Sequence, residues 1–266
     1  MHPMLNIAVR AARSAGTIIA RNVDKIDTLD IVQKSSNDYV SEVDKNAEQE
    51  IIYTLKKAFP DHAFLAEESG QQSGNEYEWI IDPLDGTTNF LHGFPQYAVS
   101  IALRHKGRLD QAVIYDPLRD ELFTASRGGG AQLNGRRLRV TNRKDLRGAL
   151  LGTGIPFRES HEAWTDNYFD MMKALIPGTA GIRRAGSAAL DLAYLAAGRL
   201  DGFWELDLNI WDIAAGVLII EEAGGLVSGI RGNPNHLETG HIVGGNPRIF
   251  KSILQKIQPH IPEDME

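Results

Sequence analysis

The chain has 266 residues, enough for one large domain or two small ones packed tightly together, and 42% of them are hydrophobic, which supports an ordinary core. The absence of cysteine excludes disulfide bonds, thiol nucleophiles and thiolate zinc sites. A formal net charge of −7 argues against general nucleic-acid binding, although it does not exclude a local basic face. No apolar run reaches the ~20 residues that cross a membrane, and the N-terminus lacks the features of a signal peptide, so we expect a cytoplasmic protein.

The first sixty residues predict two amphipathic helices with a short strand between them. Apolar and small residues recur at helical spacing over residues 5–19, and a strand is expected at 30–34. Ser41 and Asp44 then form a capping pattern in front of a second helix, which ends before Pro60. Capping alone would account for Asp44.

The next segment predicts a strand at residues 62–66 with two acids, Glu67 and Glu68, at its end. Because successive strand side chains point to opposite faces, at most one of these glutamates can reach a shared site. The polar, glycine-containing stretch 71–77 predicts a mobile loop that helps to close such a site.

The most informative stretch begins at residues 79–81, three apolar residues that predict the end of a buried strand. Asp82 and Asp85 follow three positions apart, with Pro83 between them fixing the backbone. Two carboxylates this close repel each other unless a cation lies between them or one binds a proton, which suggests a hard cation held by oxygen ligands. Residues 86–89 permit a tight reversal and offer hydroxyl and backbone N–H groups to an anion.

A cation beside an anion pocket is the arrangement used in metal-assisted hydrolysis of phosphate esters. The eight histidines form no His-Glu-x-x-His pair, so carboxylates are the available ligands, which favours Mg²⁺, Mn²⁺ or Ca²⁺ over zinc. A capped turn with two solvated acids explains the same residues equally well, because Asp and Gly are common in turns. Local chemistry alone leaves both interpretations open.

The middle of the chain predicts an antiparallel meander whose last hairpin is closed by Asn134-Gly135. The glycine-rich run at 127–130 predicts a turn and not a phosphate loop, because neither a Gly-Lys-Ser/Thr sequence nor a helical pattern follows it. The expected strands of the meander are at residues 98–103, 111–115 and 121–125.

A polar, basic stretch near 142–147 is the best candidate boundary within a single domain of residues 1–266, between halves 1–145 and 146–266. In the second half, Glu205 lies in an apolar strand and could bind polyol hydroxyls, although an outward-facing strand residue fits equally well. Asp212 begins a helix that is apolar on all sides, where the helix dipole favours an acid and where a metal ligand could be held. The elements expected here are strands at 149–153, 202–206, 226–228 and 242–243 and helices at 162–175, 186–197, 213–223 and 248–257.

Several of these motifs, in the same order along nearly the whole chain, resemble those of the inositol monophosphatase family. The matching segments are 38–44, Glu67-Glu68-Ser69, 79–90, Gly186-Ser187-Ala188 and 211–225. Residues 183–194 are most similar to the bacterial SuhB-type branch of that family. The resemblance implies an α+β fold, the layered αβαβα sandwich of the inositol monophosphatase and fructose-1,6-bisphosphatase type.

The resemblance also implies roles for individual residues. Two or three Mg²⁺ ions would be bound, with Asp82 as a bridging ligand. Asp44 would accept a hydrogen bond from Thr87, and these two residues with Glu67 would orient the attacking water. The implied metal ligands are Glu67, Asp82, the carbonyl of Leu84, Asp85 and Asp212.

The substrate would be bound by residues on both sides of this acidic corner, with Arg184 as the alternative to Arg183. The implied substrate-binding residues are Leu84, Asp85, Gly86, Thr87, Arg183, Gly186, Ser187, Ala188, Glu205 and Asp212.

The expected activity is Mg²⁺-dependent hydrolysis of a small polyol phosphate monoester, with inositol 1-phosphate as the expected substrate and lithium as an inhibitor. Related phosphatases act on 3′-phosphoadenosine phosphate, fructose bisphosphate or NADP, which are the alternative substrates. The SuhB-type resemblance implies a further role in transcription antitermination of ribosomal RNA operons, through Nus factors and RNA polymerase. Both roles could coexist. Family members are commonly homodimers, but no sequence feature fixes the oligomeric state.

Overall fold

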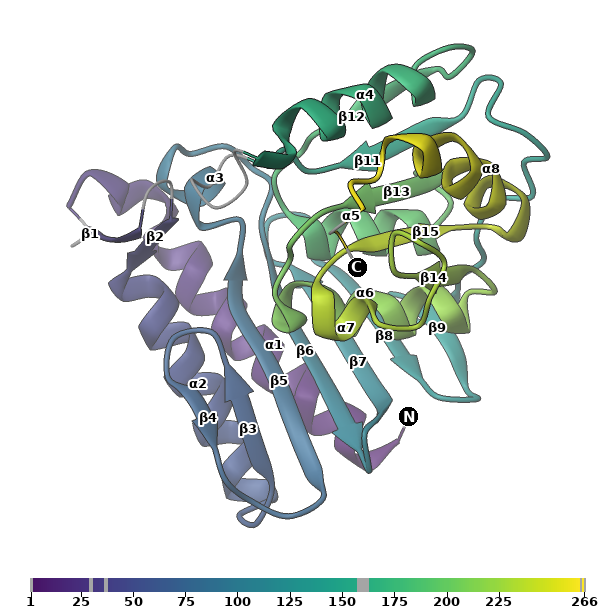
Figure 1. The fold of residues 1–266 in the computed structure, drawn as a ribbon. Coiled ribbons are helices and arrows are strands. Elements are labelled where there is room, and N and C mark those ends of the chain that lie inside the picture. The colour runs from purple at the N-terminus through teal and green to yellow at the C-terminus, as the bar shows by residue number, and fades with distance from the viewer. Residues whose placement is uncertain (1, 29–30, 36–37, 157–162, 264, 266) are drawn as a thin grey trace.

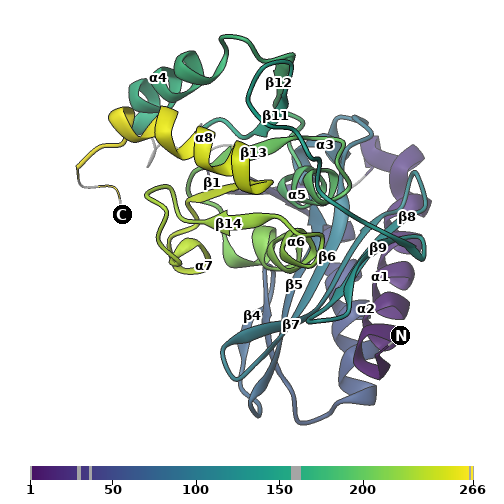
Figure 2. The same cartoon turned by 90° about the vertical axis from the view of Figure 1, so that its right-hand side faces the viewer.

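The computed structural model describes residues 2–28, 31–35, 38–156, 163–263 and 265. Its elements form five layers in the order helix, sheet, helix, sheet, helix (Figure 1), and the view turned by 90° separates these layers clearly (Figure 2). The expected α+β fold and αβαβα sandwich are confirmed. Among the described residues, no helix combines the length and the apolar character that a membrane span requires.

The first layer consists of helices α1 (Pro3–Asn22) and α2 (Glu42–Ala58), which cover one face of an eight-stranded sheet. The strands of this sheet run in the order β10-β9-β8-β7-β6-β5-β3-β4. They are β3 (Ala63–Ala66), β4 (Gly70–Gln72), β5 (Tyr77–Asp85), β6 (Ala98–His105), β7 (Arg108–Asp116), β8 (Glu121–Ser126), β9 (Gly130–Leu133) and β10 (Arg136–Arg137).

Both faces of this large sheet are buried, which explains the continuous apolar run in β5. Trp79 and Ile81 pack with the core under α1 and α2, whereas Ile80 packs with the core on the opposite face. A strand covered on both faces is apolar throughout and does not alternate with polar residues. Strands β6 to β9 confirm the predicted meander, and Asn134 and Gly135 form its last turn with positive φ values of 48° and 79°.

The middle layer consists of α5 (Ala188–Ala196) and α6 (Ile210–Glu222), which lie between the two sheets. Residues 213–220 of α6 are all buried, so the prediction of a helix apolar on all sides between layers is confirmed. At Gly216 an added Cβ would lie 2.5 Å from the side chain of Leu192, so the two helices approach closely at this glycine.

The second sheet has five strands in the order β12-β11-β13-β15-β14, and its outer face is covered by α4 (Thr165–Leu175) and α8 (Pro247–Ile257). The start of the helix predicted at 162–175 falls partly outside the described residues. The strands of this sheet are β11 (Leu150–Thr153), β12 (Gly181–Arg183), β13 (Gly202–Glu205), β14 (Leu226–Ser228) and β15 (Ile242–Gly245).

Short elements complete the chain. The expected strand near residue 30 is β1, which pairs with β2 in a separate hairpin. The remaining elements are β1 (Ile31–Ser35), β2 (Asp38–Ser41), α3 (Thr87–Leu91), α7 (His236–Thr239) and the 3-10 segments Val23–Thr28 and Gln258–His260.

The prediction that residues 71–77 form a loop closing the site is wrong. Gln71 and Gln72 belong to β4, which pairs with β3 and leads the chain back to the opposite end of β5. There the backbone N–H of Asn75 donates to the carbonyl oxygen of Asp61 at 2.7 Å. A nine-residue strand spans roughly 30 Å, so residues 73–77, at the start of β5, lie far from the acids at its other end.

Candidate active site

The acidic corner lies at the end of β5, where the strand carries a bulge and does not end at Ile81 as predicted. In the pairing with β6, Asp82 lies opposite Ser100 and Asp85 lies opposite Ala98. Two residues of β5 therefore lie opposite one residue of β6 between these pairs, which is a β-bulge. In a regular strand, side chains three positions apart would point to opposite faces. The extra residue of the bulge returns Asp85 to the face of the sheet on which Asp82 lies, so both carboxylates face α5 and α6. Leu84 packs on the opposite face, under α1 and α2.

Asp212 reaches the same place from the first turn of α6. Its carboxylate accepts a hydrogen bond from the backbone N–H of Asn209 at 2.7 Å and so caps its own helix. One oxygen from each of Asp82, Asp85 and Asp212 lies within 4.8 Å of the other two. The carboxylate of Asp212 therefore caps α6 and also belongs to the acidic cluster.

The electrostatics of this cluster fit a bound cation. Burial, with the charges of the neighbouring acids added to it, raises the pKa of Asp82 and of Asp212 well above the ordinary value. Burial raises the pKa of Asp85 to about 6, although hydrogen bonds from Ser187 and the backbone favour its charged form. A divalent cation would offset the repulsion, and a set of carboxylate oxygens suits Mg²⁺.

Glu67 joins this group from the end of β3, which runs parallel to β5. Its backbone N–H donates to the carbonyl oxygen of Ile81 at 3.1 Å, and its charge raises the pKa of Asp82 and Asp212. Its neighbour Glu68 lines a separate hollow beside α2. Of the two glutamates, only Glu67 lines the cavity above the acids.

The turn after β3 is held by Glu48, a residue that sequence reasoning missed. Its side chain projects from α2 and is only 2% exposed. The two carboxylate oxygens accept hydrogen bonds from the backbone N–H groups of Glu68 and Ser69, both at 2.8 Å. These bonds fix the backbone directly after Glu67, and the only signal in the sequence is an acid one turn after Asp44 on a buried helix face.

Asp44 makes two sets of contacts, one that caps a helix and one that reaches Thr87. One carboxylate oxygen accepts hydrogen bonds from the backbone and side chain of Ser41 and caps α2. The other accepts a hydrogen bond from the hydroxyl of Thr87 at 2.8 Å, and the same hydroxyl lies 3.1 Å from the carbonyl oxygen of Leu84. Burial raises the pKa of Asp44, while these hydrogen bonds oppose the rise. The structure thus joins the start of α2 to the acidic corner.

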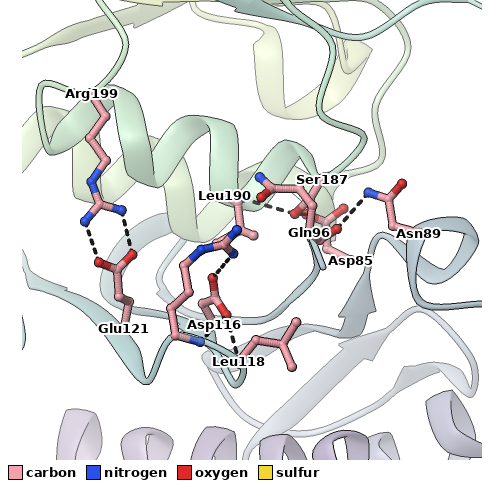
Figure 3. Close-up of polar contacts among 10 residues, drawn as sticks. Asp85, Asn89, Gln96, Asp116, Leu118, Glu121, Ser187, Leu190 and Arg199 are labelled. Atoms are coloured by element: carbon pink, nitrogen blue, oxygen red, sulfur yellow. Dashed lines mark hydrogen bonds and ion pairs between the residues drawn. The ribbon is translucent and has the colours of Figure 1, made fainter. Parts of the chain in front are cut away.

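Asp85 is held by the start of α5. Its Oδ2 accepts a hydrogen bond from the hydroxyl of Ser187 (Figure 3). The same oxygen accepts a hydrogen bond from the backbone N–H of Ala189 at 2.8 Å. The amide of Asn89 donates to the carbonyl oxygens of Ala185 and Gly186 and ties the corner to the same helix. The groups at the start of α5 that sequence analysis assigned to substrate therefore bind Asp85 in this structure.

Gly86, the turn residue of the corner, has a φ of 97°, and an added Cβ would lie 2.8 Å from the carbonyl oxygen of Gln96. At the other end of α5, Arg199 forms an ion pair with Glu121 of β8 (Figure 3). The helix is therefore tied to the large sheet at both ends.

A cavity of about 490 Å³ opens above the cluster, a volume suited to a small ligand. Leu84 and Asp82 are buried and do not line it, and its walls come from both halves of the chain. The lining includes the predicted residues Glu67, Asp85, Gly86, Thr87, Gly186, Ser187, Ala188, Glu205 and Asp212, together with Thr88, Asn89, His92, Thr153, Gly154, Arg184, Asp191 and Leu208.

The structure corrects the choice of Arg183 as a cavity residue. Arg183 is exposed at the end of β12, and its guanidinium lies back along the strand, 3.2 Å from where a Cβ on Gly181 would be. Strand side chains two positions apart share a face, which explains this direction. The next residue, Arg184, lines the cavity instead.

Glu205 comes from the end of β13 and lies against Gly154, where an added Cβ would be only 1.6 Å from its carboxylate oxygen. The missing side chain at Gly154 therefore provides the space that the carboxylate of Glu205 occupies.

Comparison with known proteins agrees with this geometry. The model of the inositol monophosphatase family matches residues 1–262. A Nus factor SuhB from Pseudomonas aeruginosa is 57% identical over 270 residues and covers 100% of both chains. The solved extragenic suppressor protein suhB from Bartonella henselae has a TM-score of 0.94 and 44% identity over 98% of this chain and 100% of that one. An inositol monophosphatase from Anabaena (Nostoc) has a TM-score of 0.85 and 38% identity over 97% and 96%. The chain therefore belongs to the inositol monophosphatase family, and its resemblance to the SuhB-type branch is confirmed.

Proposed function

We propose that the chain is a Mg²⁺-dependent phosphatase for a small polyol phosphate monoester, with inositol 1-phosphate as the first substrate. The observation that carries the proposal is the cluster of Asp82, Asp85 and Asp212 beneath a cavity that Thr87 also lines. Membership of the inositol monophosphatase family supports the reaction class, as does the likeness to a solved structure with that name.

Two or three Mg²⁺ ions would be held by the cluster, by Glu67 and by the carbonyl oxygen of Leu84. When bound, such ions stabilise charge on phosphoryl oxygens and make hydroxide available near neutral pH. The three aspartates are fixed by the bulge and by the starts of α5 and α6, so few side chains would need to reorder on binding.

Thr87, Asp44 and Glu67 would position the attacking water. The hydroxyl of Thr87 donates its hydrogen to Asp44, which leaves a lone pair on its oxygen to accept a hydrogen bond from water in the cavity. Glu67 lines the same cavity and can accept a second hydrogen bond from that water. Two acceptors would then fix its orientation towards phosphorus.

The substrate would lie between the acidic corner and the second sheet. Residues of the corner and of the α5 start would contact the phosphate, while Glu205 would bind hydroxyl groups of the polyol. We assign the cationic contact to Arg184, in place of Arg183. The proposed substrate-binding residues are Leu84, Asp85, Gly86, Thr87, Arg184, Gly186, Ser187, Ala188, Glu205 and Asp212.

A second role, in transcription, is supported by the relatives named Nus factor SuhB, one of which is 57% identical over the full chain. We propose that this protein also associates with Nus factors and RNA polymerase in the cytoplasm, as a homodimer. An interaction surface does not require the active site, so both roles can belong to one protein.

Replacing Asp82 by Asn should lower the rate of phosphate release at least about 100-fold. Even residues that only hydrogen-bond to metal ligands typically change metal affinity or activity 10–100-fold. Phosphate release with Mg²⁺ would be measured on inositol 1-phosphate, 3′-phosphoadenosine phosphate, fructose bisphosphate and NADP, with lithium as inhibitor. Asp170→Asn, at an exposed ion pair with Lys173, is the matched control and should keep full activity. Failure of the wild-type protein to hydrolyse any of these esters would refute the proposal.

The pKa of about 6 for Asp85 predicts how stability depends on pH without divalent ions. Between about pH 4 and pH 6 the folded protein holds a proton that the unfolded chain releases, so the free energy of unfolding falls as pH rises. Asp85→Asn lacks this group and should lose less stability over the same range. Denaturant midpoints with a chelator would test this, and added Mg²⁺ should restore wild-type stability near pH 7. Parallel pH profiles for the two proteins would contradict the prediction.

Glu48→Gln should weaken the support of Glu67, because the amide oxygen can still accept one of the two backbone hydrogen bonds whereas the amide nitrogen cannot accept the other. We expect a loss of about 1–3 kcal/mol in stability and a higher Mg²⁺ concentration for half-maximal activity. Glu42→Gln, at an exposed position of the same helix, is the control for the change in charge. An unchanged Mg²⁺ dependence would assign Glu48 a purely structural role.

Association with Nus factors and RNA polymerase should survive Asp82→Asn if the transcription role is independent of catalysis. The tagged wild-type and variant proteins would be expressed in their own host, and co-purification of both partners would be compared at equal expression. Loss of both partners in the variant alone would tie the association to the acidic cluster; no association of the wild type would reject the second role.

A further inference from the structure

Asp191 is a buried acid to which the mechanism above gives no role. It lies in the first turn of α5 with only 2% of its surface exposed, and it lines the cavity. Among the residues that the structure describes, no hydrogen bond reaches its carboxylate. An acidic side chain in this position is costly to bury unless a partner arrives from elsewhere.

Other deeply buried acids of the chain differ from Asp191 in this respect. Asp201, which is 6% exposed, accepts a hydrogen bond from the backbone N–H of Leu150 at 2.9 Å and pairs with Arg143. Asp116, at 0% exposure, accepts hydrogen bonds from the backbone N–H groups of Leu118 and Arg119 and from the guanidinium of Arg119. These acids accept hydrogen bonds from the protein itself, so burial alone does not explain a carboxylate at the cavity wall that accepts none from the described residues.

The surroundings of Asp191 indicate what its partner would be. Burial raises the pKa of Asp191 well above the ordinary value and the charge of Asp85 adds to the rise, while Arg184 opposes it. Glu205 and Arg184 line the same cavity. Beyond the acidic cluster and Glu67, the cavity therefore offers two carboxylates and one guanidinium, a set that can bind several hydroxyl groups of a ring.

We infer that Asp191 is a specificity-determining residue, whose carboxylate binds a ring hydroxyl of the substrate and disfavours a second phosphate at that position. The inference rests on the proposed phosphatase function. A hydroxyl group would supply the hydrogen bond that the carboxylate lacks, whereas a second phosphate would face Asp191 and Glu205 with like charge. The substrate class is then a polyol monophosphate with a free hydroxyl beside the bound phosphate.

Asp191→Asn is the test, with Asp191→Leu as the second variant. The KM for inositol 1-phosphate should rise about 10-fold with Asn and up to about 100-fold with Leu, as expected for loss of a hydrogen bond to a charged group. The preference for inositol 1-phosphate over fructose bisphosphate should fall in both variants. Because a buried acid that accepts no hydrogen bond from the described residues is removed, the melting temperature should rise by about 2–4 °C.

Asp201→Asn is the matched control, because that acid is buried and partnered within the protein. Its melting temperature should fall while KM stays unchanged. A wild-type protein that hydrolyses inositol 1-phosphate while both Asp191 variants keep its KM overturns this inference alone. Lower melting temperatures in both Asp191 variants also overturn it, because they would show a structural role, and a wild-type protein that hydrolyses none of the esters overturns the proposed function as well.

Discussion

Repulsion among buried and half-buried carboxylates is the interaction on which the site depends. The bulge at the end of β5 turns Asp82 and Asp85 to the same face, and α6 adds Asp212, so three acids meet within 4.8 Å. Such a group is unfavourable by itself, because burial and mutual charge both oppose ionisation. The surrounding structure must therefore hold the acids in place until a ligand of opposite charge compensates them.

The acids are held from two helical layers of the sandwich, the middle layer of α5 and α6 and the outer layer that contains α2. The start of α5 binds Asp85, the start of α6 includes Asp212, and α2 supports the corner from the opposite face of the large sheet. Within α2, Asp44 and Glu48 are one turn apart and reach two neighbouring strand ends, those of β5 and β3. The geometry of the site therefore arises from the packing of layers around strand ends, which rigid elements can maintain more accurately than a loop.

Sequence patterns predicted much of this arrangement but missed what depends on pairing between distant segments. The apolar run before Asp82 and the all-apolar helix after Asp212 indicated the buried layers and the acids at their edges. The bulge depends on the ladder with β6, which no local pattern shows. Arg183 was named first and Arg184 only as its alternative, because the three-residue strand β12 carries too little periodicity to reveal its faces. Glu48 was missed because its partners lie 20 and 21 residues away.

A comparison of two free energies indicates why the hydrogen bonds at the starts of α5 and α6 do not replace a cation. An acid at the N-terminus of a helix gains up to about 2 kcal/mol in a favourable, partly buried position. Asp85 has that position, with donors from Ser187 and Ala189, yet its pKa is still raised from 3.8 to about 6. This rise corresponds to about 3 kcal/mol against the charged form. This penalty remains after the protein's own donors are used, and burial with neighbouring charge also raises the pKa of Asp82 and Asp212. Positive charge from outside the chain would therefore favour the ionised form of all three aspartates.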